Sequence, residues 1–269
     1  MPPAPDLTGR TALLTGATGG IGNAIARALH RQGAAVKLSG RRAEVLEELA
    51  AELGERAEVL PADLSSPDDV DALAERAGEV DVLVNNAGVP GSGAVTDYTR
   101  EELDRALEVN LAAPVRLTHA LLPGMLARGR GHLVFISSTA GKVALPGAAL
   151  YSATKFGLRG FAFALHEDLR GTGVGVTAVF PGFISDAGMF ADTDIKLPPG
   201  TGTKPPEAVA DAVLTGIATN RAEIDVMAPI QRLGGWLAGP FPRLVAASTR
   251  AGGGGRIADL MAERQREKR

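Results

Sequence analysis

A tyrosine and a lysine that could transfer a proton stand four residues apart, at Tyr151 and Lys155. This spacing places two side chains next to each other on one face of a helix. A neighbouring cation favours the phenolate, so we expect the pKa of Tyr151 to fall from its ordinary value of about 10 into a range useful for acid–base chemistry. The same pair also fits an ordinary helix surface. The rest of the chain has to decide between these two interpretations.

Two further polar residues stand where chemistry could use them. Ser138 ends the apolar run 132–138, which we interpret as a buried strand, and it precedes Tyr151 by 13 residues. The loop between them contains glycine and proline and can fold back, which would bring Ser138 beside the helix that carries Tyr151. Asn110 interrupts the amphipathic helical segment 99–126. A buried amide needs hydrogen-bond partners, so Asn110 has either a structural partner or a functional one.

A glycine-rich turn near the N-terminus has the sequence context of a dinucleotide site. The short apolar run Thr11–Thr15 indicates a buried strand before it, and a helical pattern after it continues to Arg31. Glycines at such a turn let the backbone approach a pyrophosphate, which the free N–H groups and the dipole of the helix N-terminus attract. We therefore expect the turn to bind a dinucleotide. The binding residues would be Gly16, Thr18, Gly19, Gly20, Ile21 and Gly22.

The second expected strand, residues 35–40, indicates which dinucleotide binds. A site specific for NAD(H) usually carries an acidic residue at the end of this strand to hold the ribose 2′-hydroxyl. Here Gly40 takes that place, and Arg41 and Arg42 follow it. Guanidinium groups suit a 2′-phosphate, so the sequence favours NADP(H) over NAD(H). The alternative is a solvated arginine pair at the start of the next helix, residues 44–53, with little cofactor preference.

The ends of two further expected strands carry polar residues. Ligands of open parallel sheets bind outside the carboxyl ends of the strands. Residues 58–64 form the third expected strand and residues 81–88 the fourth. We place Asp63, Leu64, Asn86 and Gly88, which lie in the last residues of these strands, at the cofactor. Asp63 also fits a turn or cap residue before the next helix, and Asn85 is interpreted as structural.

Strand and helix patterns alternate six times along the chain, without an internal repeat in the sequence. Such alternation predicts an α/β fold in which helices cover both faces of a doubly wound parallel sheet. A length of 269 residues is within range for one such domain. We predict one catalytic domain over residues 1–250, with a substrate and interface segment at 187–250. A glycine hinge and a polar helix would follow at 251–269.

The composition excludes several kinds of function. A net charge of -3 gives no sign of a nucleic-acid partner. There is no cysteine, and the four histidines are scattered, so we expect no disulfide, no thiolate chemistry and no metal site. The chain carries neither a secretory signal at its N-terminus nor an apolar run long enough to span a membrane. We therefore expect a cytoplasmic protein.

A basic and apolar segment, residues 228–248, is unusual for the chain, because no acidic residue occurs between Asp225 and Asp259. Such a segment can lie on a membrane surface, but glycines and prolines interrupt this one. We therefore favour a subunit interface or a wall of the substrate site over membrane contact. The glycine- and proline-rich segment 187–203 fits a mobile lid or a plain surface loop, and Gly252–Gly255 fits a flexible linker.

Taken together, these motifs strongly resemble the short-chain dehydrogenase/reductase family in its classical form. The matching pieces lie between about residues 8 and 190, in the order and spacing of the family. One such motif by itself is weak evidence, but the set is very specific. The set comprises Thr15–Gly22 with its glycines, Asn85–Gly88, Asn110, Ser138, Tyr151 with Lys155, and Pro181–Gly182.

The resemblance implies a Rossmann sheet of seven strands, with the last strand at 223–227. It implies an oxidoreductase that moves a hydride between a nicotinamide and a carbonyl or alcohol carbon. Tyr151 resembles the general acid/base of the family, and Lys155 the residue that binds the nicotinamide ribose and lowers the pKa of the tyrosine. Ser138 would hydrogen-bond the substrate oxygen, and Asn110 would hold a water in a proton relay. Dimers and tetramers are common in the family, which implies a homo-oligomer.

The segment after the sixth strand both matches and departs from the family pattern. Pro181 and Ile184 would lie at the nicotinamide, where Ile184 would present its backbone to the amide. The family often places a threonine shortly after its Pro-Gly pair, whereas Ser185 and Asp186 stand at that place here. The contact with the nicotinamide amide is therefore open.

The residues that border the substrate cleft in this family are mostly apolar here. They are Val143, Ala144, Leu145, Phe183, Met189 and Phe190. This favours an apolar ketone, alcohol or acyl substrate over a charged sugar. Two rival interpretations stay open: a non-catalytic regulator that senses dinucleotides on the same fold, and a membrane-surface reductase of a lipid substrate or scaffold that uses residues 228–256.

Overall fold

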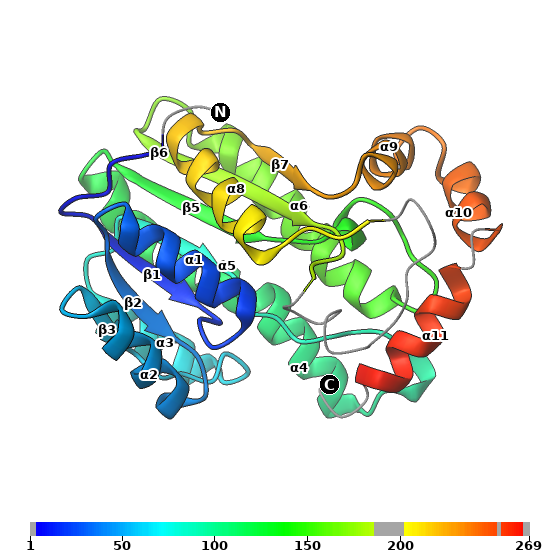
Figure 1. Ribbon diagram of the computed structural model, residues 1–269, viewed down its shortest axis with the longest axis horizontal. Helices are drawn as coiled ribbons and strands as arrows, with labels where there is room; N and C mark the ends of the chain where they lie inside the picture. The colour runs from blue at the N-terminus through cyan, green and yellow to red at the C-terminus, as the bar shows by residue number, and fades with distance from the viewer. Residues whose placement is uncertain (1–3, 186–201, 252–253, 266–269) are drawn as a thin grey trace.

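Seven parallel strands form one sheet in the order β3-β2-β1-β4-β5-β6-β7 (Figure 1). The computed structural model describes residues 4–185, 202–251 and 254–265. Leu13 pairs with Lys37 on one side and with Leu83 on the other, which fixes the register at the centre of the sheet. The strands are β1 (Thr11–Thr15), β2 (Ala35–Ser39), β3 (Ala57–Val59), β4 (Val82–Asn85), β5 (Gly131–Ile136), β6 (Val174–Pro181) and β7 (Glu223–Val226).

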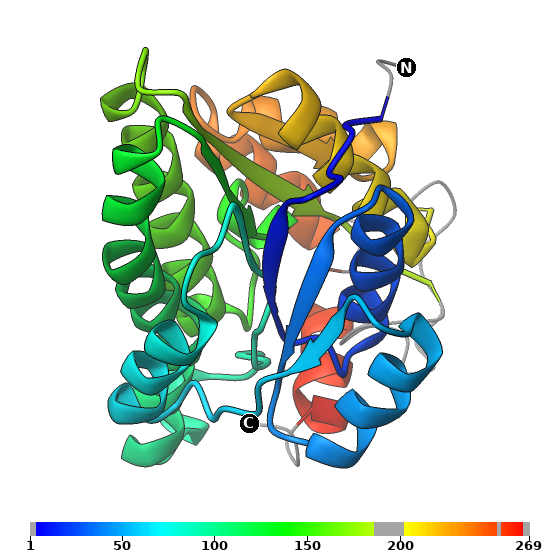
Figure 2. The ribbon, with the colours of Figure 1, turned by 90° about the vertical axis from the view of Figure 1, so that its left-hand side faces the viewer.

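Helices cover both faces of this sheet, as the two ribbon views show (Figures 1 and 2). One face carries α1 (Gly20–Arg31), α2 (Ala43–Leu53) and α8 (Pro206–Thr219). The other face carries α3 (Pro67–Ala77), α4 (Arg100–Leu107), α5 (Ala113–Ala127) and α6 (Ala149–Asp168). Three short helical turns link these elements: the 3-10 turns η1 (Val95–Asp97) and η3 (Thr139–Gly141), and the π-helical turn η2 (Glu108–Ala112).

Among the described residues, three more helices follow β7 and lie beyond the carboxyl ends of the strands (Figure 1). They are α9 (Pro229–Leu237), α10 (Pro242–Ala251) and α11 (Gly254–Gln265). Both α9 and α10 begin at a proline. Proline suits the first helical position, because an N–H group there would have no intrahelical partner and its absence costs no hydrogen bond.

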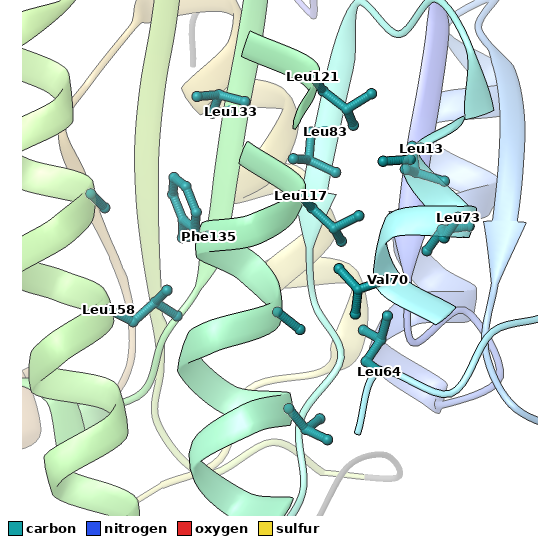
Figure 3. Packing of buried hydrophobic residues seen from close by; sticks show 14 of the residues in the cluster. Leu13, Leu64, Val70, Leu73, Leu83, Leu117, Leu121, Leu133, Phe135 and Leu158 are labelled. Atoms are coloured by element: carbon teal, nitrogen blue, oxygen red, sulfur yellow. The ribbon is translucent and has the colours of Figure 1, made fainter. Parts of the chain in front are cut away.

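Two apolar cores pack on the two faces of the sheet, because neighbouring side chains of a strand point to opposite faces. Leu13 of β1 and Leu83 of β4 belong to the core under α3 and α5, whereas Leu14 and Val84 belong to the core under α1 and α8. Figure 3 shows how leucines of α5 pack against those of β1, β4 and β5. The strands are therefore held from both sides, and their carboxyl ends have fixed positions.

The centre of the sheet lies between β1 and β4, where the order of the strands reverses. From β1 the chain builds outward to β2 and β3, and from β4 it builds the other way to β5, β6 and β7. The connections after β1 and β4 therefore leave in opposite directions and open a crevice at the carboxyl edge, which is where open α/β sheets bind ligands.

The predicted fold class is confirmed, while several boundaries differ from the sequence prediction; β4, for example, covers Val82–Asn85 instead of residues 81–88. β3 ends at Val59 instead of residue 64. The next residues still lie against the end of β2, because Leu60 donates to the carbonyl oxygen of Leu38 and Ala62 to that of Gly40. The segment 99–126 is not one helix, since the π-helical turn that contains Asn110 separates α4 from α5. α11 begins inside the predicted glycine linker, at Gly254. Residues 252 and 253 of that linker, and residues 187–201 of the predicted lid, lie outside the described residues.

Candidate active site

A cleft of about 1820 Å³ opens at the carboxyl edge of the sheet. Pockets for small molecules usually measure roughly 300–1,000 Å³, so this cleft has room for a large cofactor together with a second molecule. Of the catalytic and cofactor-binding residues expected from the sequence, all but Asn110 line it. The expected residues that line it are Gly16, Thr18, Gly19, Gly20, Ile21, Gly22, Arg41, Arg42, Asp63, Leu64, Asn86, Gly88, Ser138, Tyr151, Lys155, Pro181 and Ile184.

The glycine-rich turn after β1 has the tight geometry that only glycine allows. Gly16 has a φ of +67°, and a Cβ added to it would lie 2.7 Å from the Cα of Ala87. A Cβ on Gly22 would lie 2.2 Å from the carbonyl oxygen of Gly16. Any side chain at these two positions would push the turn away from β4 or from the first turn of α1. The glycines therefore set the shape of the turn.

The N-terminus of α1 faces this turn with unsatisfied donors. Gly19 is the N-cap residue and provides no side-chain hydrogen bond, and the first turn of α1 contains no acidic residue. The first N–H groups of a helix have no intrahelical partner and carry the positive end of its dipole. Together with the glycines, these donors fit the pyrophosphate of a dinucleotide.

Asn86 joins the end of β4 to the end of β1. Its side-chain amide donates to the carbonyl oxygens of Thr15 at 3.0 Å and Gly16 at 3.1 Å. In return, the hydroxyl of Thr15 accepts from the backbone N–H groups of Asn86 and Ala87, both at 3.1 Å. The side chain of Asn86 therefore fixes the floor of the cleft at the point where the strand order reverses. Asn85, interpreted as structural, is buried and does not line the cleft.

The two arginines after β2 differ in their surroundings. Arg42 donates to the carbonyl oxygen of Thr18 at 3.0 Å, so its guanidinium holds the glycine-rich turn. Arg41 is exposed on the cleft wall and lies near Asp63. Burial would raise the pKa of Asp63, but hydrogen bonds from Ser65 and the charges of Arg41 and Arg105 hold it below its ordinary value. No carboxylate stands at the end of β2, where Gly40 follows Ser39.

Ser138 and Tyr151 come together as the sequence predicts, because the loop after β5 folds back onto α6. The Ser138 hydroxyl lies close enough to the phenol of Tyr151 to favour its ionised form. Ser138 also accepts from the backbone N–H of Ala140 at 3.2 Å, which orients its side chain. Gly91 packs under the tyrosine, and a Cβ there would lie 2.9 Å from the Cβ of Tyr151. Gly91 thus holds the backbone end of Tyr151, while Ser138 lies at its phenol.

The expected fall in the pKa of Tyr151 is wrong for the protein without bound ligands. Burial raises the pKa of Tyr151 to about 12, and the hydrogen bond from Ser138 offsets only part of this rise. The cation of Lys155 lies 5.6 Å from the centre of the phenol ring. Its ammonium group donates instead to the carbonyl oxygen of Ile136 at 3.0 Å. Burial also lowers the pKa of Lys155 to about 8.

Asn110 is fully buried below the cleft. Both polar atoms of its side-chain amide form hydrogen bonds with the backbone of a single residue, Val89. Its Oδ1 accepts from the N–H of Val89 at 2.8 Å, and its Nδ2 donates to the carbonyl oxygen of Val89 at 3.0 Å. Val89 itself lines the cleft. Asn110 was expected to have either a structural or a functional partner, and its partner in the structure is a structural one. The side chain clamps the loop after β4 to the π-helical turn, where a bulge often marks a functional position.

Several residues that line the cleft carry no motif in the sequence. Arg105 of α4 is one of them, and it occupies an ordinary polar position of an amphipathic helix. The far wall of the cleft comes from the last three helices and is largely apolar. It includes Ile230, Leu233, Leu237, Leu244, Val245 and Met261. Only the apolar character of segment 228–248 indicated such a wall, which was one of the interpretations favoured above.

The expected substrate side of the cleft is described only in part. Phe183, Val143 and Leu145 line the cleft, whereas Ala144 does not. Asp186, Met189 and Phe190 lie outside the described residues. Among the residues that the structure describes, no group of histidine, cysteine or carboxylate side chains could hold a metal ion. In the same part of the chain, no helix is long and apolar enough to cross a membrane.

The fold and the site together define a family. A family model described as short chain dehydrogenase matches residues 10–197. The chain belongs to the short-chain dehydrogenase family of oxidoreductases, as the resemblance of its motifs predicted.

Individual relatives of the chain include curated proteins and solved structures. Nodulation protein G of Rhizobium sp. is 47% identical over 186 residues, which cover 68% of this chain and 76% of the relative. Ketoacyl reductase HetN of Nostoc sp. is 38% identical over 227 residues, which cover 82% of this chain and 79% of the relative. Among solved structures, a variant of actinorhodin polyketide ketoreductase with NADPH is 35% identical with a TM-score of 0.75, covering 85% of this chain and 99% of that one.

Proposed function

We propose that the protein is an NADP(H)-dependent oxidoreductase that interconverts a carbonyl and an alcohol. The observation that carries this proposal is the grouping of Ser138, Tyr151 and Lys155 on the wall of the cleft that begins at the glycine-rich turn. A proton donor, an oxygen-binding hydroxyl and a buried cation thus share one cleft with a cradle that fits a pyrophosphate.

The protein's own groups handle the proton and the charge on the substrate oxygen. When bound, the reduced cofactor supplies the hydride that adds to the carbonyl carbon. Tyr151 gives its proton to the carbonyl oxygen. Because its pKa lies at about 12, the phenol keeps this proton at neutral pH, which is the form that reduction requires. Ser138 can donate a hydrogen bond to the same oxygen and stabilise the negative charge that develops there.

The preference for NADP(H) rests on the end of β2. Gly40 leaves the ribose 2′ position without a carboxylate, and Arg41 offers an exposed guanidinium on the cleft wall. A guanidinium binds a phosphate through charge-assisted hydrogen bonds, which are about twice as strong as neutral ones. Relatives with bound NADPH support the same preference, including the polyketide ketoreductase.

The substrate in this proposal is an apolar ketone or acyl compound. Leu145, Phe183 and the apolar wall from α9, α10 and α11 line the same cleft as Tyr151. A ketoacyl reductase and a polyketide ketoreductase are among the relatives, which supports a ketone carried on an acyl chain. We also propose a cytoplasmic homo-oligomer that uses the exposed apolar residues Phe156 and Phe163 of α6 at its interface.

Replacement of the tyrosine hydroxyl tests the function. In a screen of ketones, aldehydes and acyl thioesters by NADPH oxidation, we expect turnover with an apolar member of the panel. Tyr151→Phe should reduce this turnover by at least about a hundredfold, which is the low end for general acid–base catalysis. NADPH binding, measured by fluorescence titration, should change little. Tyr98→Phe is the matched control, because Tyr98 is the other tyrosine of the chain and does not line the cleft.

Two results would contradict this proposal. Unchanged turnover in Tyr151→Phe would remove the tyrosine from the chemistry. NADPH binding without turnover of any compound in the panel would favour a regulator that senses dinucleotides.

A further inference from the structure

An exposed apolar face lies at the rim of the cleft, on α9, on α10 and on Phe241 directly before α10. We call it the α9–α10 face and define it by Ile230, Leu233, Trp236, Phe241 and Leu244, each of them more than half exposed. Trp236 is 83% exposed, more than any other large apolar residue that the structure describes. Single exposed apolar side chains are normal on a protein surface, but a contiguous group of large ones marks an interaction site.

The charged residues of α9 and α10 are all arginines. Arg232, Arg243 and Arg250 are exposed on the same two helices. No acidic residue occurs in the sequence from 226 to 258. A partner of this face therefore needs apolar groups next to negative charge.

The face continues into the cleft. Ile230, Leu233 and Leu244 are exposed to solvent and also line the cleft. In Figure 1, α9 and α10 project at one corner of the molecule, away from the layers that cover the sheet. A flat partner could therefore approach both helices at once, at the mouth of the cleft.

We propose that the α9–α10 face docks on the surface of an anionic lipid bilayer. Aromatic residues such as Trp236 and Phe241 prefer the boundary between headgroups and acyl chains. Apolar side chains beside them insert into this boundary, while the arginines contact anionic headgroups. No described helix crosses a membrane, so the contact is peripheral.

A second copy of the chain fits this face less well. In a twofold interface the same patch meets itself, so the arginines of one subunit would face those of the other. Like charges brought together across an interface oppose association. The face contributes no carboxylate that could neutralise them. An anionic lipid surface provides both the negative charge and the apolar depth that this face requires.

Vesicle binding by the full chain tests the docking, and it does not depend on the proposed reductase activity. Trp236 is the one tryptophan of the chain, so its fluorescence reports on this face alone. With vesicles of phosphatidylcholine and phosphatidylglycerol we expect co-sedimentation, a blue shift of the emission, and quenching by brominated acyl chains. Pure phosphatidylcholine should bind more weakly, and added salt should weaken binding to the anionic vesicles.

Two pairs of substitutions separate the apolar from the charged part of the contact. Trp236→Ser with Phe241→Ser should reduce co-sedimentation by more than about tenfold, because both side chains leave water on binding. Neither residue lines the cleft, so NADPH binding serves as the test of folding. Arg232→Gln with Arg243→Gln should reduce binding to anionic vesicles by roughly fivefold per arginine.

Matched controls lie at the opposite edge of the sheet. Leu126→Ser removes an exposed leucine before β5, and Arg31→Gln removes an exposed arginine before β2. Both control variants should bind vesicles like the unchanged protein.

Three results would overturn the docking. The first is no binding to anionic vesicles. The second is binding that the Trp236→Ser, Phe241→Ser variant retains in full. The third is a dimer in sedimentation velocity that this variant converts to a monomer, without vesicle binding by either form, because the face would then be an interface between copies.

Discussion

The ammonium group of Lys155 donates a hydrogen bond to the carbonyl oxygen of Ile136, the last residue of β5, at 3.0 Å. The lysine is thereby tied to the sheet, and its ammonium nitrogen lies 5.6 Å from the centre of the Tyr151 ring. Burial opposes the charge and lowers the pKa of Lys155 to about 8. The group that should tune the tyrosine is therefore itself close to losing its proton in the protein without ligands.

A substitution at this lysine should make stability depend less on pH. The folded pKa of about 8 lies below the ordinary 10.5, so folding disfavours the charged lysine below pH 8, and this penalty disappears as the pH rises to 10.5. Lys155→Met removes the charge. At each pH, the free energy of unfolding of the unchanged protein is subtracted from that of the variant. This difference should be about 3 kcal/mol larger at pH 7 than at pH 10.5. Urea unfolding at both pH values measures this, and equal differences would contradict the pKa shift.

Arg41 and Arg42 should affect the two cofactors differently. Arg41→Ala removes the exposed guanidinium, and we expect a loss of about tenfold or more in NADPH affinity with little change for NADH. Arg42→Ala releases the carbonyl oxygen of Thr18 and should weaken both cofactors to a similar extent. Fluorescence titration with each cofactor measures the four affinities. Equal weakening of NADPH and NADH by Arg41→Ala would leave the solvated arginine pair as the better interpretation.

The glycine-rich turn should tolerate a methyl group at one position and reject it at another. A Cβ on Gly22 would lie 2.2 Å from the carbonyl oxygen of Gly16, so Gly22→Ala should lower the free energy of unfolding by about 1–3 kcal/mol. At Gly19 the nearest atom is the same oxygen at 3.7 Å, an ordinary contact. Gly19→Ala should therefore lose less stability than Gly22→Ala in urea without cofactor, because only the N-cap of α1 is weakened. Similar losses in both variants would argue against the tight turn.

His132 should make the protein sensitive to mild acid. Burial, and after it the charge of His166, lowers the pKa of His132 to about 4, and its Nε2 lies 2.9 Å from the hydroxyl of Thr177. The neutral imidazole contributes stability that is complete above pH 6.5 and is lost as the pH falls towards 4. Between pH 7 and pH 4 the unchanged protein should lose about 3 kcal/mol more than His132→Gln. Parallel losses in urea unfolding would mean that the histidine already charges in the fold.

The fold and most of the cleft could be predicted from short local patterns. Two kinds of local feature were enough: a strand that leads into Gly16 and Gly22, and strand ends that carry Asn86 or Ser138. The parallel sheet brings these features to one edge. The spacing of Tyr151 and Lys155 likewise predicts that they share one helix face.

The rest depends on contacts between distant parts of the chain. The pKa of Tyr151 was mispredicted because spacing along a helix does not tell how deeply the phenol is buried. It also does not tell which group Lys155 bonds, and that partner comes from β5. The apolar cleft wall from α9, α10 and α11 has no motif, since only packing decides which of its leucines face the cleft. The partner of Asn110, the backbone of Val89, is equally distant in sequence.

The close approach of Gly91 to Tyr151 limits how the enzyme can be altered for new substrates. A single methyl group at Gly91 would displace the tyrosine that the loop supports, so random mutagenesis of residues 89–91 should return mostly inactive clones. Ile230, Leu237 and Leu244 contact the same cleft from helices outside the sheet layers. A library built at these three positions would change the room for substrate while the tyrosine stays in place.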